Sequence, residues 1–299
     1  MIDHALLSVL NFGLGTPPRT LYHYTSMQAL LSIVESGRIR ATHVRFLNDQ
    51  SEVVTMWELV IRRLRERIEA AESSDEKQTL SEIVQAAQSR RLLNEFVASF
   101  SQKKDDLSQW RSYCPEGVGF SIGFSSAALR SQWVSDPNGG QPSFVGALLE
   151  KIEYVDDTTL TTIDWAINAA VHFASQIEHS VAGVSKQDMI VGWLSVLAPS
   201  FKHTAFRDES EWRLILSKPH KPMPGQRFRV GKSTLVPFIE VELNKDSHRK
   251  PADAYMIHEV VVGPTPNAEL SMEALRALFE SKDQPQVRVE KSAIPYRHW

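Results

Sequence analysis

The sequence predicts an α+β fold in which strands near both ends of the chain enclose a helical middle. Short apolar segments of strand length occur in the first 125 and the last 100 residues, whereas residues 51–90 and 158–199 carry apolar side chains at helical spacing. No repeat, low-complexity tract or Pro/Ser-rich linker divides the 299 residues. We therefore expect a single domain over residues 1–299, with helical insertions at about 51–90 and 158–199.

The first half of the chain contains clear start and stop signals. Leu21 to Tyr24 is a short apolar strand, and Ser26 can cap a following helix that ends at Gly37. The spacing of apolar residues then predicts a strand at 38–42, helices over 51–90 with a break near 73–75, a strand at 96–101, a helical turn at 107–113 and a strand at 118–124.

The second half becomes mainly β after residue 200. The segment 132–146 contains Pro137, Gly139 and Gly140, which are typical of a turn or loop. Around it we expect a strand at 147–155, two helices in 158–199, strands at 211–217, 227–230, 235–243 and 256–263, a helix near 267–279 and a strand at 286–290.

Composition restricts the class of protein. A net charge of −3 gives no overall basic field, so nucleic-acid binding would depend on a local patch. Cys114 is the only cysteine, which excludes an intramolecular disulfide and a thiolate-rich zinc site, and we expect no metal. The N-terminus lacks the pattern of a signal peptide, and the longest apolar stretch, 189–199, is about half a membrane span. We expect a cytoplasmic protein without a membrane partner.

Two carboxylates one residue apart, Glu209 and Glu211, stand at the start of an apolar strand. In an extended chain, residues i and i+2 point to the same face, so the two side chains should project together and repel. This repulsion would raise the pKa of one carboxyl, as in sites that bind a sugar hydroxyl and polarise a second nucleophile. The alternative is a solvated strand start, with Glu211 paired to Arg213 on the same face.

His23 and an aromatic pair are further candidates. His23 stands near the end of the first strand, where its ring and the neighbouring backbone can hold a ribose hydroxyl and a carboxamide. Tyr113 follows Trp110 by three residues on a helical turn, so the two rings can face the same way and enclose a flat ring such as nicotinamide. The alternatives are a histidine that caps the helix and an aromatic pair that belongs to the core.

Other motifs are weak or absent from the sequence. It contains no Walker loop, Gly-x-Gly-x-x-Gly or His-Glu-x-x-His motif, and Gly117-Val-Gly119 is too short for a phosphate loop. Ser101 and Ser108 have no nearby histidine in sequence, so a serine triad has little support. Asn48-Asp49 is either a turn or a pair that supports the site through hydrogen bonds.

In combination, these segments resemble the bacterial domain-of-unknown-function 2971 family over almost the whole chain. Gln50 departs from the family pattern, which usually has proline there, and this leaves the Asn-Asp turn less rigid. The ordered motifs that carry the resemblance are Leu21 to Thr25, Phe46 to Glu52, Ala98 to Ser101, Trp110 to Tyr113, Gly119 to Phe124, Lys202 to Arg213, Val261 to Pro264 and Ser292 to Arg297.

The chain also resembles ADP-ribosyltransferases, which implies a split β-sheet core with helical insertions. His23 on the first strand, followed by a helix that ends at Gly37, looks like the opening unit of the poly-ADP-ribose polymerase and diphtheria-toxin branch. Tyr113 matches a tyrosine that stacks on nicotinamide in that branch. Glu209-Ser-Glu211 looks like the Glu-x-Glu motif of the arginine-modifying branch, with Glu211 as the catalytic glutamate.

The resemblance implies NAD as co-substrate and assigns roles to the candidate residues. Glu211 would bind the nicotinamide ribose and stabilise the cation that forms as nicotinamide leaves, and Glu209 would act on the acceptor. Arg213 would hold Glu211 ionised or contact the pyrophosphate. The residues expected to bind NAD are His23, Tyr24, Thr25, Ser101, Trp110, Tyr113 and Arg213, and those expected to bind the acceptor are Lys202, His203 and Arg207.

Lys202, His203 and Arg207 can equally belong to a solvated loop. The implied function is an ADP-ribosyltransferase that modifies a nucleic acid or a protein, in a bacterial toxin or antiphage-defence setting, with an antitoxin as a partner. A non-catalytic nucleotide- or RNA-binding sensor is the alternative from another class. An RNA 2′-phosphotransferase fits less well, because that enzyme uses basic residues where this chain has acidic ones.

Overall fold

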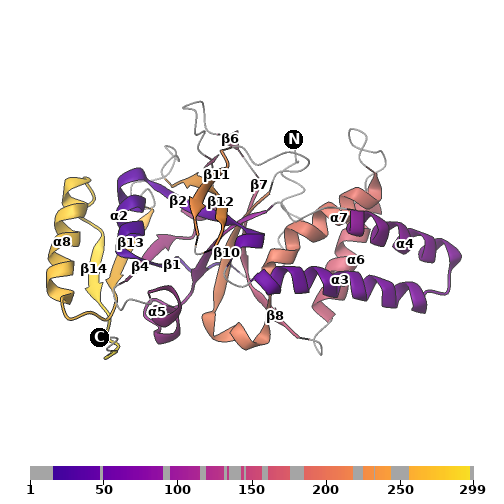
Figure 1. The fold of residues 1–299 in the computed structure, drawn as a ribbon, viewed down its shortest axis with the longest axis horizontal. Coiled ribbons are helices and arrows are strands. Elements are labelled where there is room, and N and C mark those ends of the chain that lie inside the picture. The colour runs from indigo at the N-terminus through magenta and orange to yellow at the C-terminus, as the bar shows by residue number, and fades with distance from the viewer. Residues whose placement is uncertain are drawn as a thin grey trace.

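The computed structural model describes residues 16–47, 50–89, 95–114, 119–130, 133–134, 143–144, 146–156, 161–175, 185–217, 225–231, 233–243 and 256–296. A mostly antiparallel sheet forms the centre of the molecule, with one group of helices at one side and further helices at the other (Figure 1). The predicted α+β class is thus confirmed at this level. The expectation of one domain stays a prediction.

The strands follow the predicted pattern closely, and β3 and β10 begin and end near the predicted residues. Their bounds are β1 Thr20–Thr25, β2 Arg38–His43, β3 Phe96–Ser101, β4 Phe120–Ser125, β5 Trp133–Val134, β6 Ser143–Phe144, β7 Gly146–Lys151, β8 Glu153–Val155, β9 Phe201–His203, β10 Glu211–Ser217, β11 Arg227–Val230, β12 Leu235–Glu242, β13 Ile257–Val262 and β14 Arg288–Lys291.

The helices are also where the apolar spacing predicts them. Ser26 caps α2 by accepting a hydrogen bond from the backbone of Ala29, and Gly37 ends the helix with a left-handed φ of 62°, which glycine adopts without steric cost. The bounds are α2 Met27–Ser36, α3 Gln50–Ala70, α4 Ser74–Ser89, α5 Leu107–Tyr113, α6 Thr161–Ser175, α7 Lys186–Leu197 and α8 Ala268–Ser281, with 3₁₀ segments η1 Val44–Phe46, η2 Ala128–Arg130, η3 Ala198–Ser200 and η4 Thr204–Glu209.

Two separate apolar clusters hold these layers together. One lies between the sheet and helices α2 and α8, and Phe96, Ile122 and Phe124 are completely buried there. The other is centred on Leu64 and Ile83. It lies among α3, α4, α6 and α7, which together form the group of helices at one side of Figure 1. The two predicted helical insertions therefore pack on each other, so that they bury one continuous apolar surface.

Two predictions need correction. The segment 132–146, predicted as a turn or loop, contains the short strands β5 and β6, which pair with each other. The expected strand at 147–155 is two strands, β7 and β8, because the chain leaves the large sheet at Ile152. The backbone N–H of Ile152 makes a last hydrogen bond to this sheet, to the carbonyl of Glu211. β8 then pairs in parallel with β9, a short strand that the sequence does not predict. This small second sheet places Lys202 opposite Tyr154, directly behind the start of β10.

The feature that positions the site is a division in the large sheet at β3. β10 pairs with β3 along its length, from Glu211↔Ser101 to Leu216↔Phe96. On the other edge of β3, β1 pairs at a single position, Tyr22↔Ser101, while β1 pairs with β4 over all six residues. Beyond Tyr22, β1 and β3 therefore separate and leave an opening between them.

Candidate functional site

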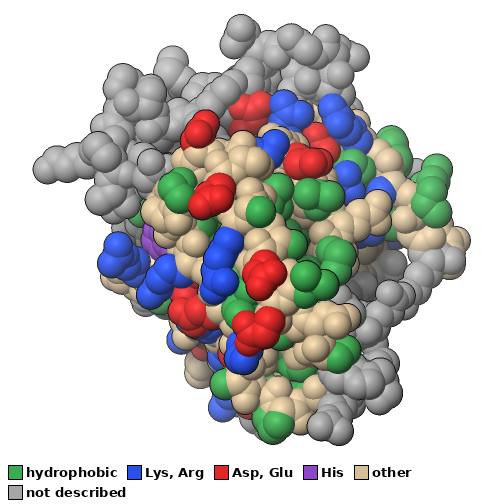
Figure 2. All heavy atoms as spheres, turned by 90° about the vertical axis from the view of Figure 1, so that its left-hand side faces the viewer, with side chains coloured by type: hydrophobic (Ala, Val, Ile, Leu, Met, Phe, Trp, Pro, Cys, Tyr) green, Lys and Arg blue, Asp and Glu red, His purple; other side chains and the backbone are tan. Residues whose placement is uncertain are grey.

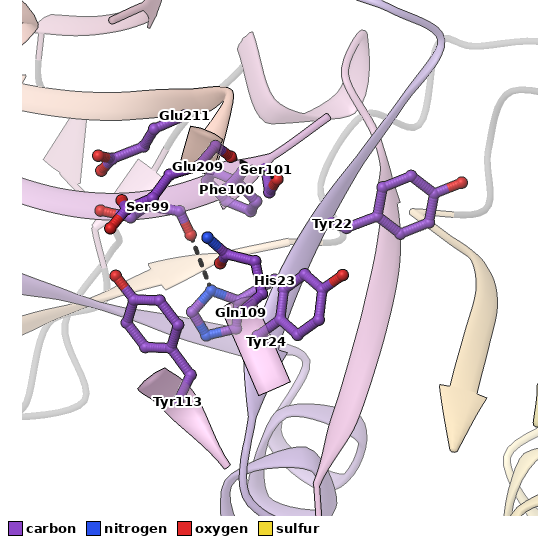
Figure 3. Close-up of a pocket in the computed structure, with 10 residues that line it drawn as sticks. All are labelled: Tyr22, His23, Tyr24, Ser99, Phe100, Ser101, Gln109, Tyr113, Glu209 and Glu211. Atoms are coloured by element: carbon purple, nitrogen blue, oxygen red, sulfur yellow. Dashed lines mark hydrogen bonds between the residues drawn. The ribbon is translucent and has the colours of Figure 1, made fainter. Parts of the chain in front are cut away.

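A pocket occupies the opening between β1 and β3. Its cavity volume is about 50 Å³, and it is partly open to solvent. Figure 3 shows side chains from β1, β3, α5, η4 and β10 around it. The lining residues are Tyr22, His23, Tyr24, Ser99, Phe100, Ser101, Gln109, Tyr113, Glu209 and Glu211.

His23 bridges the opening. Its Nδ1 lies 2.9 Å from the carbonyl oxygen of Ser99. Because a carbonyl oxygen only accepts hydrogen bonds, Nδ1 must carry the proton, and Nε2 of the neutral ring is then an acceptor. Burial lowers the pKa of His23 and outweighs the Ser99 hydrogen bond, which favours the charged form. The ring is thus neutral at pH 7 and fixed in one tautomer.

Helix α5 covers one side of the pocket and is held there by its first turn. Asp106 caps it by accepting from the backbone N–H groups of Ser108 and Gln109. The Tyr24 hydroxyl accepts from the backbone N–H of Asp106 at 3.0 Å and donates to the carbonyl of Lys103 at 2.8 Å. Tyr24 thereby fixes the start of α5 against β1, and Gln109 and Tyr113 project from α5 toward the carboxylates (Figure 3).

The predicted Trp110–Tyr113 pair does not form a sandwich at the pocket. Trp110 is 2% exposed, its ring packs edge-on against Tyr24 at 4.6 Å, and its Nε1 donates to Asp105 at 2.7 Å. Tyr113 alone of the two lines the pocket. The NAD-binding prediction for Trp110 is therefore wrong in its geometry, because this ring serves the core instead. Thr25 is likewise buried and is not among the lining residues.

Glu211 is a buried carboxylate held by two cations. Arg213 Nε donates to its Oε1 at 2.7 Å and Nη2 to its Oε2 at 3.1 Å, while Lys202 Nζ donates to Oε2 at 3.2 Å. Burial raises the pKa of Glu211, but the charges of Arg213 and Lys202 and hydrogen bonds from Arg213 and the Ser99 hydroxyl outweigh it, so that the pKa lies below its usual value. The expected rise through carboxylate repulsion does not occur at Glu211.

Glu209 lines the same pocket, but its backbone position differs from the predicted one. It ends η4 rather than lying on the strand, and Ser210 between the two glutamates has a left-handed backbone with φ 48° and ψ 48°. The expectation of an extended i, i+2 pair is therefore wrong. Instead, the Ser101 hydroxyl donates to the Glu209 carbonyl at 2.7 Å, and Lys202 Nζ donates to the Glu209 carboxylate at 2.7 Å. These bonds bring both carboxylates to one side of the pocket.

The three residues expected to bind the acceptor are divided by the structure. Lys202 is 1% exposed and paired to both glutamates, so its assignment to a solvated, acceptor-facing loop is wrong. His203 and Arg207 are exposed on the adjoining β9 and η4 segments, where a large acceptor can reach them. Arg213 is 3% exposed behind Glu211, which fits a role in holding this carboxylate rather than in contacting pyrophosphate. Asn48-Asp49 lies outside the described residues.

The lining is rich in hydrogen-bond acceptors and poor in cations. None of the ten lining residues is a lysine or an arginine. Several lining hydroxyls donate their proton into the protein: Tyr22 to Glu259, Tyr24 to Lys103, Ser101 to Glu209 and Ser99 to Glu211. A ligand here would meet two carboxylates and a neutral imidazole, which favour N–H or O–H donors and positive charge over a phosphate or a carboxylate.

Five residues of the site are not predicted by the sequence: Tyr22, Ser99, Phe100, Gln109 and Tyr154. Ser99 and Phe100 lie on the predicted strand at 96–101, on which only Ser101 was expected at the site, and Gln109 stands one residue before the aromatic pair. Tyr154 accepts the backbone N–H of Glu211 at 2.9 Å, and burial raises its pKa to about 12. Alternation along β3 gives a signal for Ser99, which shares a face with Ser101. No local signal connects Tyr154 to a strand start 57 residues away.

A family model matches the segment of the chain that contributes α5, η4 and β10 to this site. Residues 109–214 match the family model described as "Protein of unknown function (DUF2971)". The match covers about a third of the chain, from Gln109 on α5 to Leu214 on β10, whereas the motif resemblance extends from Leu21 to Arg297. No match was found among curated proteins or among solved structures.

The face that carries α8 gives no simple indication of a partner. On the face that carries α8, acidic and basic side chains are interspersed with small apolar areas (Figure 2). Leu270 on α8 is 67% exposed there. Within the described part of the chain, no helix is both long and apolar enough to cross a membrane.

Proposed function

We propose that the protein is an NAD-dependent ADP-ribosyltransferase that transfers ADP-ribose to a nucleic acid or a protein. The observation that carries the proposal is convergence: His23, Tyr113, Glu209 and Glu211, from three distant parts of the sequence, line one pocket. These are the residues to which the resemblance assigns cofactor binding and catalysis. Two carboxylates and a neutral imidazole at one open cavity are typical of functional sites.

The charge of the pocket supports a cationic ligand. The nicotinamide ring of NAD is positively charged until the glycosidic bond breaks, after which the positive charge develops on the ribose. Arg213 and Lys202 keep Glu211 ionised and in place, which suits a carboxylate that stabilises such a charge. Because a phosphate beside the two carboxylates would be repelled, the nicotinamide ribose rather than the pyrophosphate of NAD would lie against them.

The chemical step assigns a role to each side chain. Tyr113 stacks on the nicotinamide ring, and the acceptor side of His23 receives a hydrogen bond from a ribose hydroxyl or an amide. The C1′–N bond breaks with its electron pair going to nicotinamide, which leaves as a neutral molecule. The acceptor nucleophile then bonds to C1′ and transfers its proton to Glu209 or to water.

The exposed residues beside the pocket are the place for the acceptor. His203 and Arg207 lie on the segments that continue into Glu209, so a phosphate or acidic acceptor can contact them while its nucleophile reaches the pocket. By analogy with toxins that share the resemblance, we place this activity in a bacterial toxin or antiphage-defence setting with an antitoxin partner.

The test is release of nicotinamide over time from NAD, with and without cell lysate. Glu211→Gln should reduce this release by at least about two orders of magnitude, because the charge that stabilises the cation is lost. Glu209→Gln should retain release to water but lower labelling of an acceptor. Glu290→Gln, which removes a carboxylate paired with Lys104 away from the pocket, is the matched control.

Two outcomes would contradict the proposal. Full turnover by a folded Glu211→Gln protein would remove the catalytic role of this residue. Binding of NAD without any release of nicotinamide by the wild type would instead indicate the sensor, because a pure binder leaves the glycosidic bond intact.

A further inference from the structure

Lys202 occupies an unusual position for a lysine. Its side chain is 1% exposed, on a short strand of the small β8–β9 sheet. Its ammonium lies 2.7 Å from Glu209 Oε2 and 3.2 Å from Glu211 Oε2, so one cation joins both carboxylates of the pocket. Isolated buried lysines tend to lose their proton, but here the two carboxylates outweigh the effect of burial and raise the pKa of Lys202.

The chemistry of the ammonium suits this place. It has three N–H donors in a tetrahedral arrangement, of which two point to the carboxylates. The ring of Phe206 lies against the third side, with its centroid 4.6 Å from Nζ, and its negative face attracts a cation. An acceptor phosphate therefore has no access to Lys202, and the lysine must act through the glutamates.

Arg213 performs a different task. Its guanidinium binds both oxygens of Glu211 and the carbonyl of Pro199, which fixes the carboxylate to β10. Lys202 instead binds across the turn at Ser210, and so connects the end of η4 to the start of β10. Without it, two neighbouring carboxylates would face each other with the charge of Arg213 on one side only.

We propose that Lys202 is a positioning residue that holds Glu209 and Glu211 side by side as ionised carboxylates, so that both present hydrogen-bond acceptors to a ligand in the pocket. Its catalytic consequence rests on the function proposed above, whereas its effect on the two carboxylates does not. The charged and titratable groups around the pair are Lys202 on β9, Arg213 on β10, Tyr154 on β8, His23 on β1 and Tyr113 on α5.

The direct experiment is a titration of the glutamate side chains by carboxyl-carbon NMR in the isotopically labelled full chain. In Lys202→Met, one of the two carboxyls should take up a proton at a pH about 1 to 3 units higher than in the wild type, because a cation at hydrogen-bond distance is removed. Lys202→Arg keeps the charge and should restore a titration close to the wild type. A residue that only fills space would not produce this pattern.

The chain offers a matched control. Lys104 also joins two carboxylates, Glu259 at 2.9 Å and Glu290 at 2.6 Å, and it does not line the pocket. Lys104→Met should leave the titration of Glu209 and Glu211 unchanged. An equal effect of the two lysine variants on this titration, or no effect of Lys202→Met, overturns the proposal.

A double variant guards against a folding defect. Lys202→Met combined with Glu209→Gln removes one positive and one negative charge, so the balance around Glu211 is kept. This protein should fold even where Lys202→Met alone does not, and Glu211 should titrate close to its wild-type position. An unfolded double variant means that the lysine serves more than the two carboxylates, which overturns the proposal.

Turnover of NAD provides the second readout. Lys202→Met should lower kcat most at acidic pH and move the acidic limb of the profile upward, and Lys202→Arg should return the limb to its place. If the wild type does not turn over NAD, the proposed function fails while the NMR titration still decides the role of Lys202. If turnover is present but its acidic limb stays in place in Lys202→Met, the function stands and this inference fails.

Discussion

His23 Nδ1 donates a hydrogen bond to the carbonyl oxygen of Ser99 at 2.9 Å, across the opening where β1 and β3 cease to pair. A side chain of β1 thus satisfies a backbone acceptor of β3 where the strands have separated. The same bond fixes the orientation of the imidazole, and it exposes an acceptor nitrogen rather than a donor to the pocket. The separation of β1 from β3 therefore also determines which nitrogen of His23 carries the proton.

We predict that His23 makes stability depend on pH near neutrality. Its pKa is lowered by burial from an unfolded value of about 6.5, so the unfolded chain binds more protons below that pH. Its contribution is fully present above about pH 6.5 and is lost as the pH falls toward the lower folded value. His23→Asn keeps an amide donor for Ser99 but does not titrate. Urea unfolding of both proteins at several pH values should show a smaller loss on acidification in the variant, and identical losses would contradict the assignment.

The two aromatic residues of α5 should respond differently to truncation. Trp110→Ala should lower the free energy of unfolding by about 3 to 5 kcal/mol, because a fully buried ring is removed from the core. Tyr113→Ala should cost less stability but weaken NAD binding, since this ring lines the pocket. Chemical unfolding and calorimetry with NAD measure the two effects. A Trp110 variant that folds normally but loses NAD binding would restore the predicted sandwich.

Ser210 should be sensitive to side-chain shape. Its φ of 48° lies in the left-handed region, which is unfavourable for most residues by about 1 to 2 kcal/mol and free of steric cost for glycine. Ser210→Gly should therefore keep or slightly raise the stability, whereas the β-branched Ser210→Val should lower it and displace Glu209 from Lys202. Thermal unfolding and a crystal structure of the valine variant would check this. Equal stability of both variants would mean that the turn is not strained.

The lining should select a carboxamide over a carboxylate. The pocket lining includes Glu209 and Glu211 but no lysine or arginine. Nicotinic acid adenine dinucleotide, which carries an extra carboxylate, should therefore bind at least about tenfold more weakly than NAD. Glu209→Gln replaces one carboxylate by a neutral amide and should reduce this preference. Competition binding with both dinucleotides measures it. A preference for the acid form would show that the ring lies elsewhere.

Much of the fold can be predicted because its signals are local. The cap at Ser26, the left-handed stop at Gly37 and the break before α4 depend on residues within a few positions of one another. The apolar run after Glu211 likewise predicts β10. The expected extended pair Glu209–Glu211 is wrong because a single left-handed residue, Ser210, changes the direction of the chain, and serine gives little sign of such a turn.

The sequence by itself determined most of the helices and strands, the α+β class and the identity of the carboxylates and the histidine that converge. Only the tertiary structure decided which charges face the pocket and which lie behind it. The pairing of β8 with β9 buries Lys202 as a bridge between two glutamates, and the packing of Trp110 on Tyr24 leaves Tyr113 alone at the opening. The physical reason is distance along the chain. Helix and strand propensities depend on near neighbours, whereas burial and ion pairing depend on contacts such as His23 with Ser99, 76 residues apart.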